Sequence, residues 1–330
     1  MYLLFALLSG VVLSLLISVN GSLAGVYGLF SATAVIHLVG SVCALAACLL
    51  QRDKKPLWGR RPGWIYLGGA IGVFTTVTQN FAFGHISMTS IVGLVLLGQT
   101  VASLFIDRFG LFGMARRQVQ KQSWLGLVLS LIGIAVMLDG SVTAAAFAVA
   151  AAFLSGVTAV VSRTVNARLA EQTGALRGSL VNHLVGLPIS VVLALLLGGA
   201  NAFVPAAGVV IRPWMYLGGA LGVLLVLLCN MAVPRISAFR MTLLAFVGQV
   251  FTGILLDALF GVGYSEASFI GGVCIALGIA VNLVGERLAA GRERRESEYL
   301  ARIRRIEAEY QRRILEKHSV RQAPIDARRA

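Results

Sequence analysis

Charged side chains are scarce in this sequence of 330 residues, because only 13% are charged whereas 58% are hydrophobic. Soluble domains carry roughly 25% charged residues, so this composition excludes a soluble globular protein. Cysteine is rare as well: the four copies all fall inside apolar stretches and lack metal-ligand spacing (Cys43, Cys48, Cys229 and Cys274). We expect them to be packing residues, with no metal site and no cofactor.

Acidic residues are missing from the interior of every apolar stretch, and the sequence also lacks catalytic signatures. Neither H-E-x-x-H nor G-x-S-x-G occurs, and no pair of aspartates lies within an apolar stretch. These patterns carry the metal ligands and nucleophiles of common hydrolases. An enzyme is therefore not expected.

Long apolar stretches are what the sequence has in abundance. Each is about 20 residues long, which is enough to cross a bilayer core of roughly 30 Å as a helix. Helices satisfy their backbone groups internally, as lipid requires, and the stretches are continuous rather than alternating. The sequence predicts an all-α integral membrane protein with ten spans, at 2–22, 30–50, 64–84, 88–106, 123–139, 143–162, 178–198, 213–232, 241–258 and 268–285.

The net charge of +14 is unevenly distributed over the connections between these spans. Every second connection is basic, and together these hold fourteen residues: Arg52, Lys54, Lys55, Arg60, Arg61, Arg108, Arg116, Arg117, Lys121, Arg163, Arg168, Arg177, Arg235 and Arg240. The other connections hold only Arg212. Because Lys and Arg concentrate in cytoplasmic loops, we expect both termini to be cytoplasmic and no nucleic acid to be bound.

The chain repeats itself after nearly half its length. H-L-V-G occurs at His37–Gly40 and again at His183–Gly186, an offset of 146 residues. Trp64–Val73 matches Trp214–Val223 in eight of ten positions at an offset of 150. The series also pairs Asn20 with Asn166, Asn80 with Asn230, Gln99 with Gln249 and Asp107 with Asp257. The consistent order predicts a duplicated unit.

Each unit contains five spans, and an odd number requires the second unit to enter the membrane upside down. The charges agree: the connection after the second span has five basic residues, whereas its counterpart after the seventh has one. The predicted organisation is a first repeat at 1–140, an inverted repeat at 141–285 and a basic cytoplasmic tail at 286–330. Inverted repeats are typical of secondary transporters that alternate access to a central site.

Four stretches within residues 1–285 carry a family resemblance: V-N-G-S-L-A at Val19–Ala24, N-H-L-V-G at Asn182–Gly186, Y-L-G-G-A at Tyr66–Ala70, and L-G-Q…D-R-F-G-L-F-G within Leu97–Gly113. With them the chain resembles the YdcZ-type exporters of the drug/metabolite transporter (DMT) superfamily, in a fused tandem form. The resemblance implies an EamA-like helical bundle in the bacterial inner membrane that exports a small molecule of unassigned identity. The first-helix glutamate of the superfamily's small multidrug branch has no equivalent here.

Two glutamines are the leading candidates for substrate contact. Gln99 and Gln249 lie near the centres of the fourth and ninth spans. A carboxamide in the bilayer core needs a partner, which can be a substrate or a hydrogen bond from a neighbouring helix. We weigh these two roles about equally, and the symmetric pair favours a shared central site.

His37 and His183 are candidates for proton coupling, because imidazole titrates near neutrality. The sequence places them about two turns inside their spans, near opposite faces of the membrane. A neutral histidine bonded to a neighbouring backbone group is the more conservative interpretation.

The remaining polar residues lie close to span ends. Asn20, Asn166, Asn80 and Asn230 are interpreted either as helix-end contacts or as further substrate ligands. We expect Asp107 and Asp257 to be solvated or paired with an arginine such as Arg108.

The tail repeats apolar residues at helical spacing, so part of it is predicted to be an amphipathic helix. It could lie on membrane lipid or pair with a second copy as a homodimer. Export of a small metabolite or amphipathic compound is the leading function. The alternatives are a flippase for a lipid-linked substrate and a non-transporting sensor or assembly factor that acts through the tail.

Overall fold

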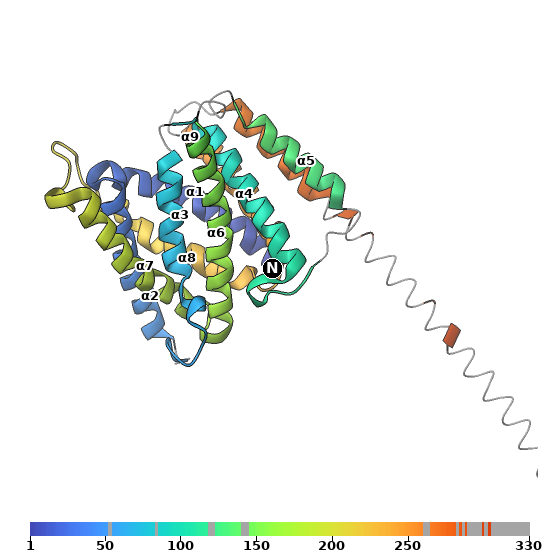
Figure 1. The fold of residues 1–330 in the computed structure, drawn as a ribbon, viewed down its shortest axis with the longest axis horizontal. Helices are drawn as coiled ribbons and strands as arrows, with labels where there is room; N and C mark the ends of the chain where they lie inside the picture. The colour runs from blue at the N-terminus through green and yellow to red at the C-terminus, as the bar shows by residue number, and fades with distance from the viewer. Residues whose placement is uncertain are drawn as a thin grey trace, which may run out of the picture. The chain divides into compact units, whose positions relative to one another are not determined.

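The computed structural model describes residues 1–51, 55–82, 85–117, 123–139, 145–259 and 265–281, together with residues 284, 285, 288, 299, 303 and 304. The regular structure of these residues is helical, and none of them forms a strand (Figure 1). Two compact units divide the chain, Met1–Ala280 and Val281–Ala330. The predicted tail, 286–330, falls almost entirely outside the described residues.

The first unit is built from ten helices, which are α1 Tyr2–Tyr27, α2 Leu29–Leu50, α3 Gly68–Ala82, α4 Met88–Phe109, α5 Ser123–Val136, α6 Ala146–Thr173, α7 Ala175–Gly198, α8 Leu217–Ala232, α9 Ala238–Leu259 and a last helix, Glu266–Val281. Each corresponds to one predicted span. Seven described segments are long and apolar enough to cross a membrane, whereas α3, α5 and Glu266–Val281 have at most 16 residues. Short 3-10 turns precede α3 and α8, at Gly63–Tyr66 and Pro213–Tyr216.

Two of the predicted loops are single residues. Only Gly28, at φ 75°, separates α1 from α2, and only Gly174, at φ 95°, separates α6 from α7. Such positive φ angles favour glycine, which has no β-carbon to collide with the backbone. The prediction that Arg163 lies in the connection between the sixth and seventh spans is therefore wrong, because α6 continues ten residues beyond it. Arg168 and Arg177 likewise lie within α6 and α7, but each is within six residues of the turn at Gly174.

The helices interleave the two halves of the chain. The first helix of each half packs on the third and fourth helices of the other half: α1 contacts α8 and α9, and α6 contacts α3 and α4. Glycine allows the close approach, since a β-carbon at Gly10 would overlap the Ala245 carbonyl and one at Gly156 would overlap the Val95 carbonyl. Small residues bring membrane helices together in this way.

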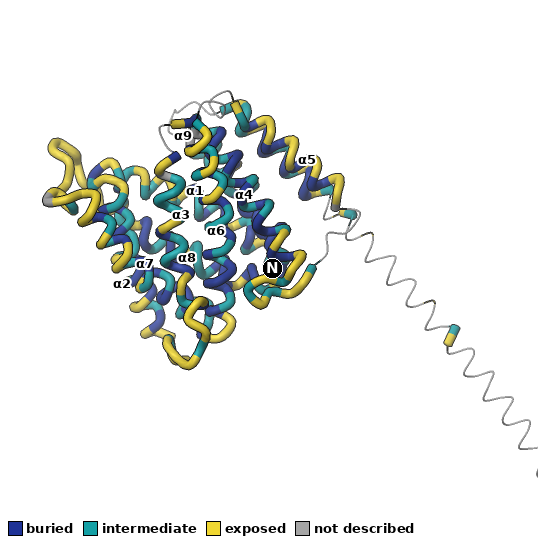
Figure 2. Tube along the Cα trace, viewed as in Figure 1, coloured by how far each residue is buried: buried dark blue, intermediate teal, exposed yellow. Residues whose placement is uncertain are grey.

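The last helices of the two halves form a separate pair. Figure 1 shows α5 beside the helix Glu266–Val281, and Gly133 of α5 lies against Gly271. Buried and exposed positions alternate along α5 (Figure 2). Large apolar side chains are exposed elsewhere too, such as Phe147 at 85% and Leu196 at 74%. An apolar exterior of this kind suits a bundle surrounded by lipid.

Asp107 is not the solvated or Arg108-paired residue that the sequence predicts. Its carboxylate is buried at the end of α4 and accepts the backbone N–H groups of Ala238 and Phe239, at 2.8 and 2.9 Å. These N–H groups begin α9 and have no partner within their own helix, so a carboxylate satisfies both them and the helix dipole. Asp107 therefore joins the two halves. The side chain of its repeat counterpart, Asp257, lies outside the described part.

Candidate functional site

The two H-L-V-G copies meet where α2 packs against α7. The ring centroids of His37 and His183 are 5.8 Å apart, with the ring planes inclined at 53°. His183 is buried, with 3% of its surface exposed, whereas His37 is half-buried. A sequence match between distant segments thus corresponds to a direct contact.

Each histidine occupies space that a glycine of the other copy leaves free. A β-carbon on Gly40 would overlap the imidazole of His183, and a β-carbon on Gly186 would overlap the imidazole of His37. These contacts pair residue 37 with 186 and residue 40 with 183, so the two helices run antiparallel. The His-to-Gly spacing within the motif brings both contacts into register.

The prediction that the histidines lie near opposite faces is wrong, because their ring centroids are 5.8 Å apart, whereas their predicted depth of about two turns agrees with the structure. Each stands eight residues after the start of its helix, which is about 12 Å into helices of 22 and 24 residues. Because α2 and α7 start from opposite ends, both rings come close to mid-length. Hydropathy alone placed the start of α7 three residues late, at 178 instead of Ala175.

Both imidazoles are oriented by their own helices. Nδ1 of His37 lies 2.9 Å from the Thr33 carbonyl oxygen, and Nδ1 of His183 lies 2.8 Å from the Ser179 carbonyl oxygen. A carbonyl can only accept, so each Nδ1 carries the proton and donates it. Nε2 of each ring is directed toward the opposite helix and is an acceptor whenever the ring is neutral.

Gln99 and Gln249 lie mid-way along α4 and α9, each eleven residues after its helix begins. Both side chains are half-buried, and their carboxamides make no hydrogen bond within the described part of the chain. One turn from Gln99, the hydroxyls of Ser103 and Thr242 are bonded at 2.6 Å and tie α4 to α9. The structure thus places the glutamines on one helix pair and the histidines on another.

The asparagines divide into bonded and unbonded groups. Asn166 donates from Nδ2 to Oδ1 of Asn182 at 2.7 Å, and Asn230 donates to the Ala175 carbonyl at 2.9 Å. Among the described residues, Oδ1 of Asn20, which lies against Gly218, and Oδ1 of Asn230 are both buried without a hydrogen-bond partner. The side chain of Asn80 is outside the described part of the structure.

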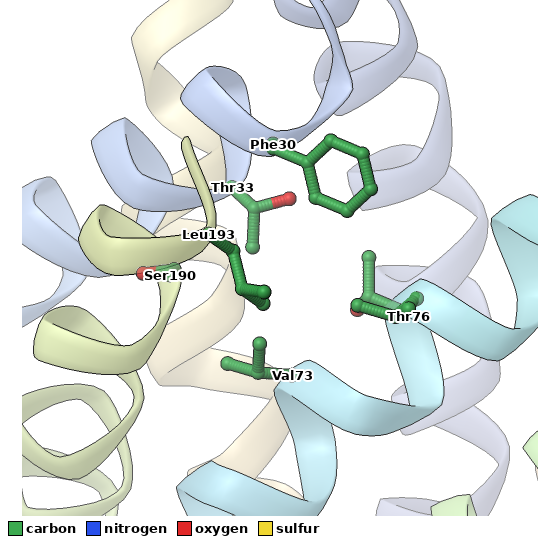
Figure 3. Close-up of a pocket in the computed structure, with 7 residues that line it drawn as sticks. Phe30, Thr33, Val73, Thr76, Ser190 and Leu193 are labelled. Atoms are coloured by element: carbon green, nitrogen blue, oxygen red, sulfur yellow. The ribbon is translucent and has the colours of Figure 1, made fainter. Parts of the chain in front are cut away.

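A crevice opens beside the histidine pair. It is a narrow groove between α2, α3 and α7 without room for an enclosed water molecule, and it is lined by Phe30, Thr33, Val73, Thr76, Val77, Ser190 and Leu193 (Figure 3). None of the eight candidate residues lines it. Its hydroxyls bond within their own helices: Thr33 to the Leu29 carbonyl, Thr76 to Gly72 and Ser190 to Leu187. The crevice therefore presents a mainly apolar surface to whatever enters it.

Opposite the crevice, at the other end of α2 and α7, the corresponding helices are closely packed. We call the two ends the crevice end and the packed end. Buried Ala44, Cys48, Leu180 and Val223 form a cluster there, with Leu176 against them. Sequence analysis missed both features, although the repeat offset already pairs Phe30 with Leu176 and Val73 with Val223.

Comparison with known proteins agrees with the helical architecture and the duplication. A family model described as "Putative inner membrane exporter, YdcZ" matches the chain twice in tandem, over residues 1–136 and 147–283. Among curated proteins no match was found. A solved structure described as "Crystal structure of protein" has a TM-score of 0.62 at 19% identity, covering 87% of this chain and 97% of its own, and is similar in fold. This multi-pass membrane protein belongs to the YdcZ family of inner-membrane exporters.

Proposed function

We propose that the protein is a secondary transporter that exports a small metabolite or amphipathic compound by alternating access between two inverted repeats. The observation that carries this proposal is the meeting of the two H-L-V-G copies near mid-length of α2 and α7. Transporters built from inverted repeats bind substrate near mid-membrane, at the interface between the repeats.

Reciprocal contacts support the inverted arrangement. Gly68 lies against Asn166, and its counterpart Gly218 lies against Asn20. Gly69 lies against the Asn182 carbonyl, and its counterpart Gly219 lies against the Ile36 carbonyl. Contacts that exchange the halves in this way are expected of a pseudo-two-fold axis. With the basic connections on the cytoplasmic side, this axis lies in the membrane plane and the crevice faces outward.

Of the candidate ligands, the glutamines and Asn20 are the ones we assign to the substrate. The carboxamides of Gln99 and Gln249 have no partner among the described residues, and neither has Oδ1 of Asn20. Asn166 and Asn230 each use Nδ2 in a bond between helices, so we assign them to stabilising the bundle, although Oδ1 of Asn230 also has no partner among the described residues. Unsatisfied amide groups in a membrane interior are available to a substrate.

The histidine pair is our candidate for proton coupling. Each ring has one free acceptor nitrogen, and the centroids are 5.8 Å apart. A proton taken up by one ring would place a positive charge beside the other, which opposes a second protonation and loosens the seam. One coupling proton for each cycle is the expected stoichiometry.

The test begins with a thermal-shift screen of purified protein against neutral and cationic amphipathic metabolites. A hit is then loaded into proteoliposomes and its efflux is measured with an imposed pH gradient. Gln99→Ala and Gln249→Ala should each reduce efflux at least about tenfold, as loss of a buried amide contact worth more than 1.4 kcal/mol would do.

Full efflux by both variants would show that Gln99 and Gln249 do not bind the substrate. If efflux by the parent protein did not depend on the pH gradient, proton coupling would be contradicted. Ser22→Ala is the control, because its hydroxyl is exposed and bonds only to the Ser18 carbonyl of its own helix.

A further inference from the structure

Two hydroxyl residues at equivalent positions of the repeats make different hydrogen bonds. Thr33 of α2 and Ser179 of α7 correspond at the offset of 146. Ser179 donates across to the Val223 carbonyl of α8 at 3.2 Å, whereas Thr33 donates to the Leu29 carbonyl of its own helix at 2.8 Å. The counterpart of Val223 is Val73, which lines the crevice. The bond that ties α7 to α8 therefore has no equivalent between α2 and α3.

The two hydroxyl residues also differ in burial. Ser179 has none of its surface exposed and adjoins Leu180 of the packed cluster, whereas Thr33 is half-buried in the crevice wall. Figure 3 shows Thr33 and Val73 on opposite helices around the same opening. One end of the seam has a hydrogen bond between helices, and the equivalent end lacks it.

Both hydroxyl residues are connected to the histidine pair. The carbonyl of Thr33 accepts the Nδ1 proton of His37, and the carbonyl of Ser179 accepts the Nδ1 proton of His183. Each hydroxyl thus lies one helical turn from the seam, on the side of its own end. A shift of α2 relative to α7 would change both hydroxyl environments together.

We propose that Ser179 and Thr33 are alternating latches of the transport cycle. In the state seen here, the Ser179–Val223 bond closes the packed end. In the opposite state the Thr33 hydroxyl leaves the Leu29 carbonyl and donates to the Val73 carbonyl, which closes the crevice, while Ser179 returns to the Ala175 carbonyl of its own helix. The number of hydrogen bonds is conserved, so the exchange has a small energetic cost. This inference rests on the proposed alternating access and names the residues that set it.

The test measures the accessibility of each end without any substrate. Single cysteines are placed at Leu193, in the crevice wall, and at its repeat counterpart Ala47, in protein whose four native cysteines are replaced by alanine. Purified protein in detergent is labelled with fluorescein-5-maleimide, which reaches both ends. Both residues are half-buried in this state, so the labelling rates of Leu193→Cys and Ala47→Cys in the parent protein are the reference values for the variants.

The two latch variants should then act in opposite directions. Removal of one net hydrogen bond of about 1 kcal/mol changes an equilibrium about fivefold. Ser179→Ala should therefore raise the labelling rate of Ala47→Cys about fivefold, and Thr33→Val should lower it by a similar factor. Ser179→Thr keeps the hydroxyl and should label like the parent, as should Ser22→Ala.

Unchanged Ala47→Cys labelling in Ser179→Ala, or a rise in Thr33→Val, would overturn the latch. Because Thr33→Val is tested independently, a folding failure of one variant leaves the other decisive. The expected labelling changes in a protein that transports no tested compound would support the latch and count against the proposed function. Transport with no labelling response would do the reverse.

Discussion

At the scale of single residues, the close fit between glycine and imidazole at the α2–α7 seam decides which substitutions the bundle tolerates. Gly40 and Gly186 have no room for a methyl group, because His183 and His37 fill the space. Gly21, in α1, has open space around the position of its missing β-carbon. The same glycine-to-alanine change should therefore have opposite effects at these sites.

Gly40→Ala and Gly186→Ala should each lower the free energy of unfolding by about 1–3 kcal/mol, the usual cost of overpacking. The measurement is thermal unfolding of purified protein in detergent. Gly21→Ala serves as the matched control and should be neutral or stabilising by up to about 1 kcal/mol, since alanine favours a helix. Equal effects at all three positions would mean that helix propensity, and not the histidine contact, governs them.

Asp107→Ala should destabilise the protein by about 0.5–2 kcal/mol, because the first N–H groups of α9 lose their acceptor. Urea unfolding monitored by circular dichroism would measure the change. Arg108→Ala is the control and should lie within about 0.5 kcal/mol of the parent. A comparable loss in both variants would indicate an ion pair with Arg108 instead of a helix cap.

At the scale of helices, equivalent pairs of helices are in contact in the two halves, but the residues that form these contacts differ. The packing of α6 on α3 includes a bond from Ser162 to the Gly68 carbonyl, and α6 is tied to α7 by Asn166 and Asn182. The equivalent positions in the first half are Leu16 for Ser162 and Ile36 for Asn182. Each end thus has polar bonds of its own, because the hydroxyls of Tyr27 and Tyr216 are bonded at 2.7 Å at the crevice end.

A double-mutant cycle tests the bond between α6 and α7. Asn166→Ala and Asn182→Ile should be non-additive, with a coupling energy of about 0.5–1.5 kcal/mol for one hydrogen bond. Thermal unfolding of the two single variants and the double variant supplies the values. The control cycle combines Asn166→Ala with Asn230→Ala, whose amide donates to Ala175, and should be additive. Additivity in both cycles would contradict the bond.

At the scale of the whole molecule, the proposed orientation makes a prediction about access from outside the cell. Single cysteines at Lys55 and Arg212, in the cysteine-depleted protein, should lie on opposite sides of the membrane. In intact spheroplasts a membrane-impermeant maleimide should label Arg212→Cys. It should label Lys55→Cys only after permeabilisation, because the connection that contains Lys55 is rich in Lys and Arg and is therefore expected on the cytoplasmic side. Labelling of both in intact spheroplasts would contradict the inverted arrangement.

Hydropathy predicted the ten helices and the repeat predicted the duplication, because both signals extend over many residues, whereas the family was predicted from its resemblance in four short stretches. Features that depend on single residues could not be predicted from these two signals. The turn at Gly174 is one residue long, so a hydropathy average could not show that Arg163 lies within α6. The role of Asp107 depends on Ala238 and Phe239, which are 131 and 132 residues away along the chain. Whether the glutamines bind substrate stays a prediction.

The seam between α2 and α7 also has a consequence for how such a chain can arise. H-L-V-G contains both partners of this contact, one helical turn apart: the histidine, whose imidazole projects, and the glycine, which leaves space for an imidazole. A copy of the segment running the other way is therefore complementary to the original without any further mutation. Duplication of one five-helix gene would deliver a fitted partner at once, and later divergence of either copy would be constrained by these same four residues.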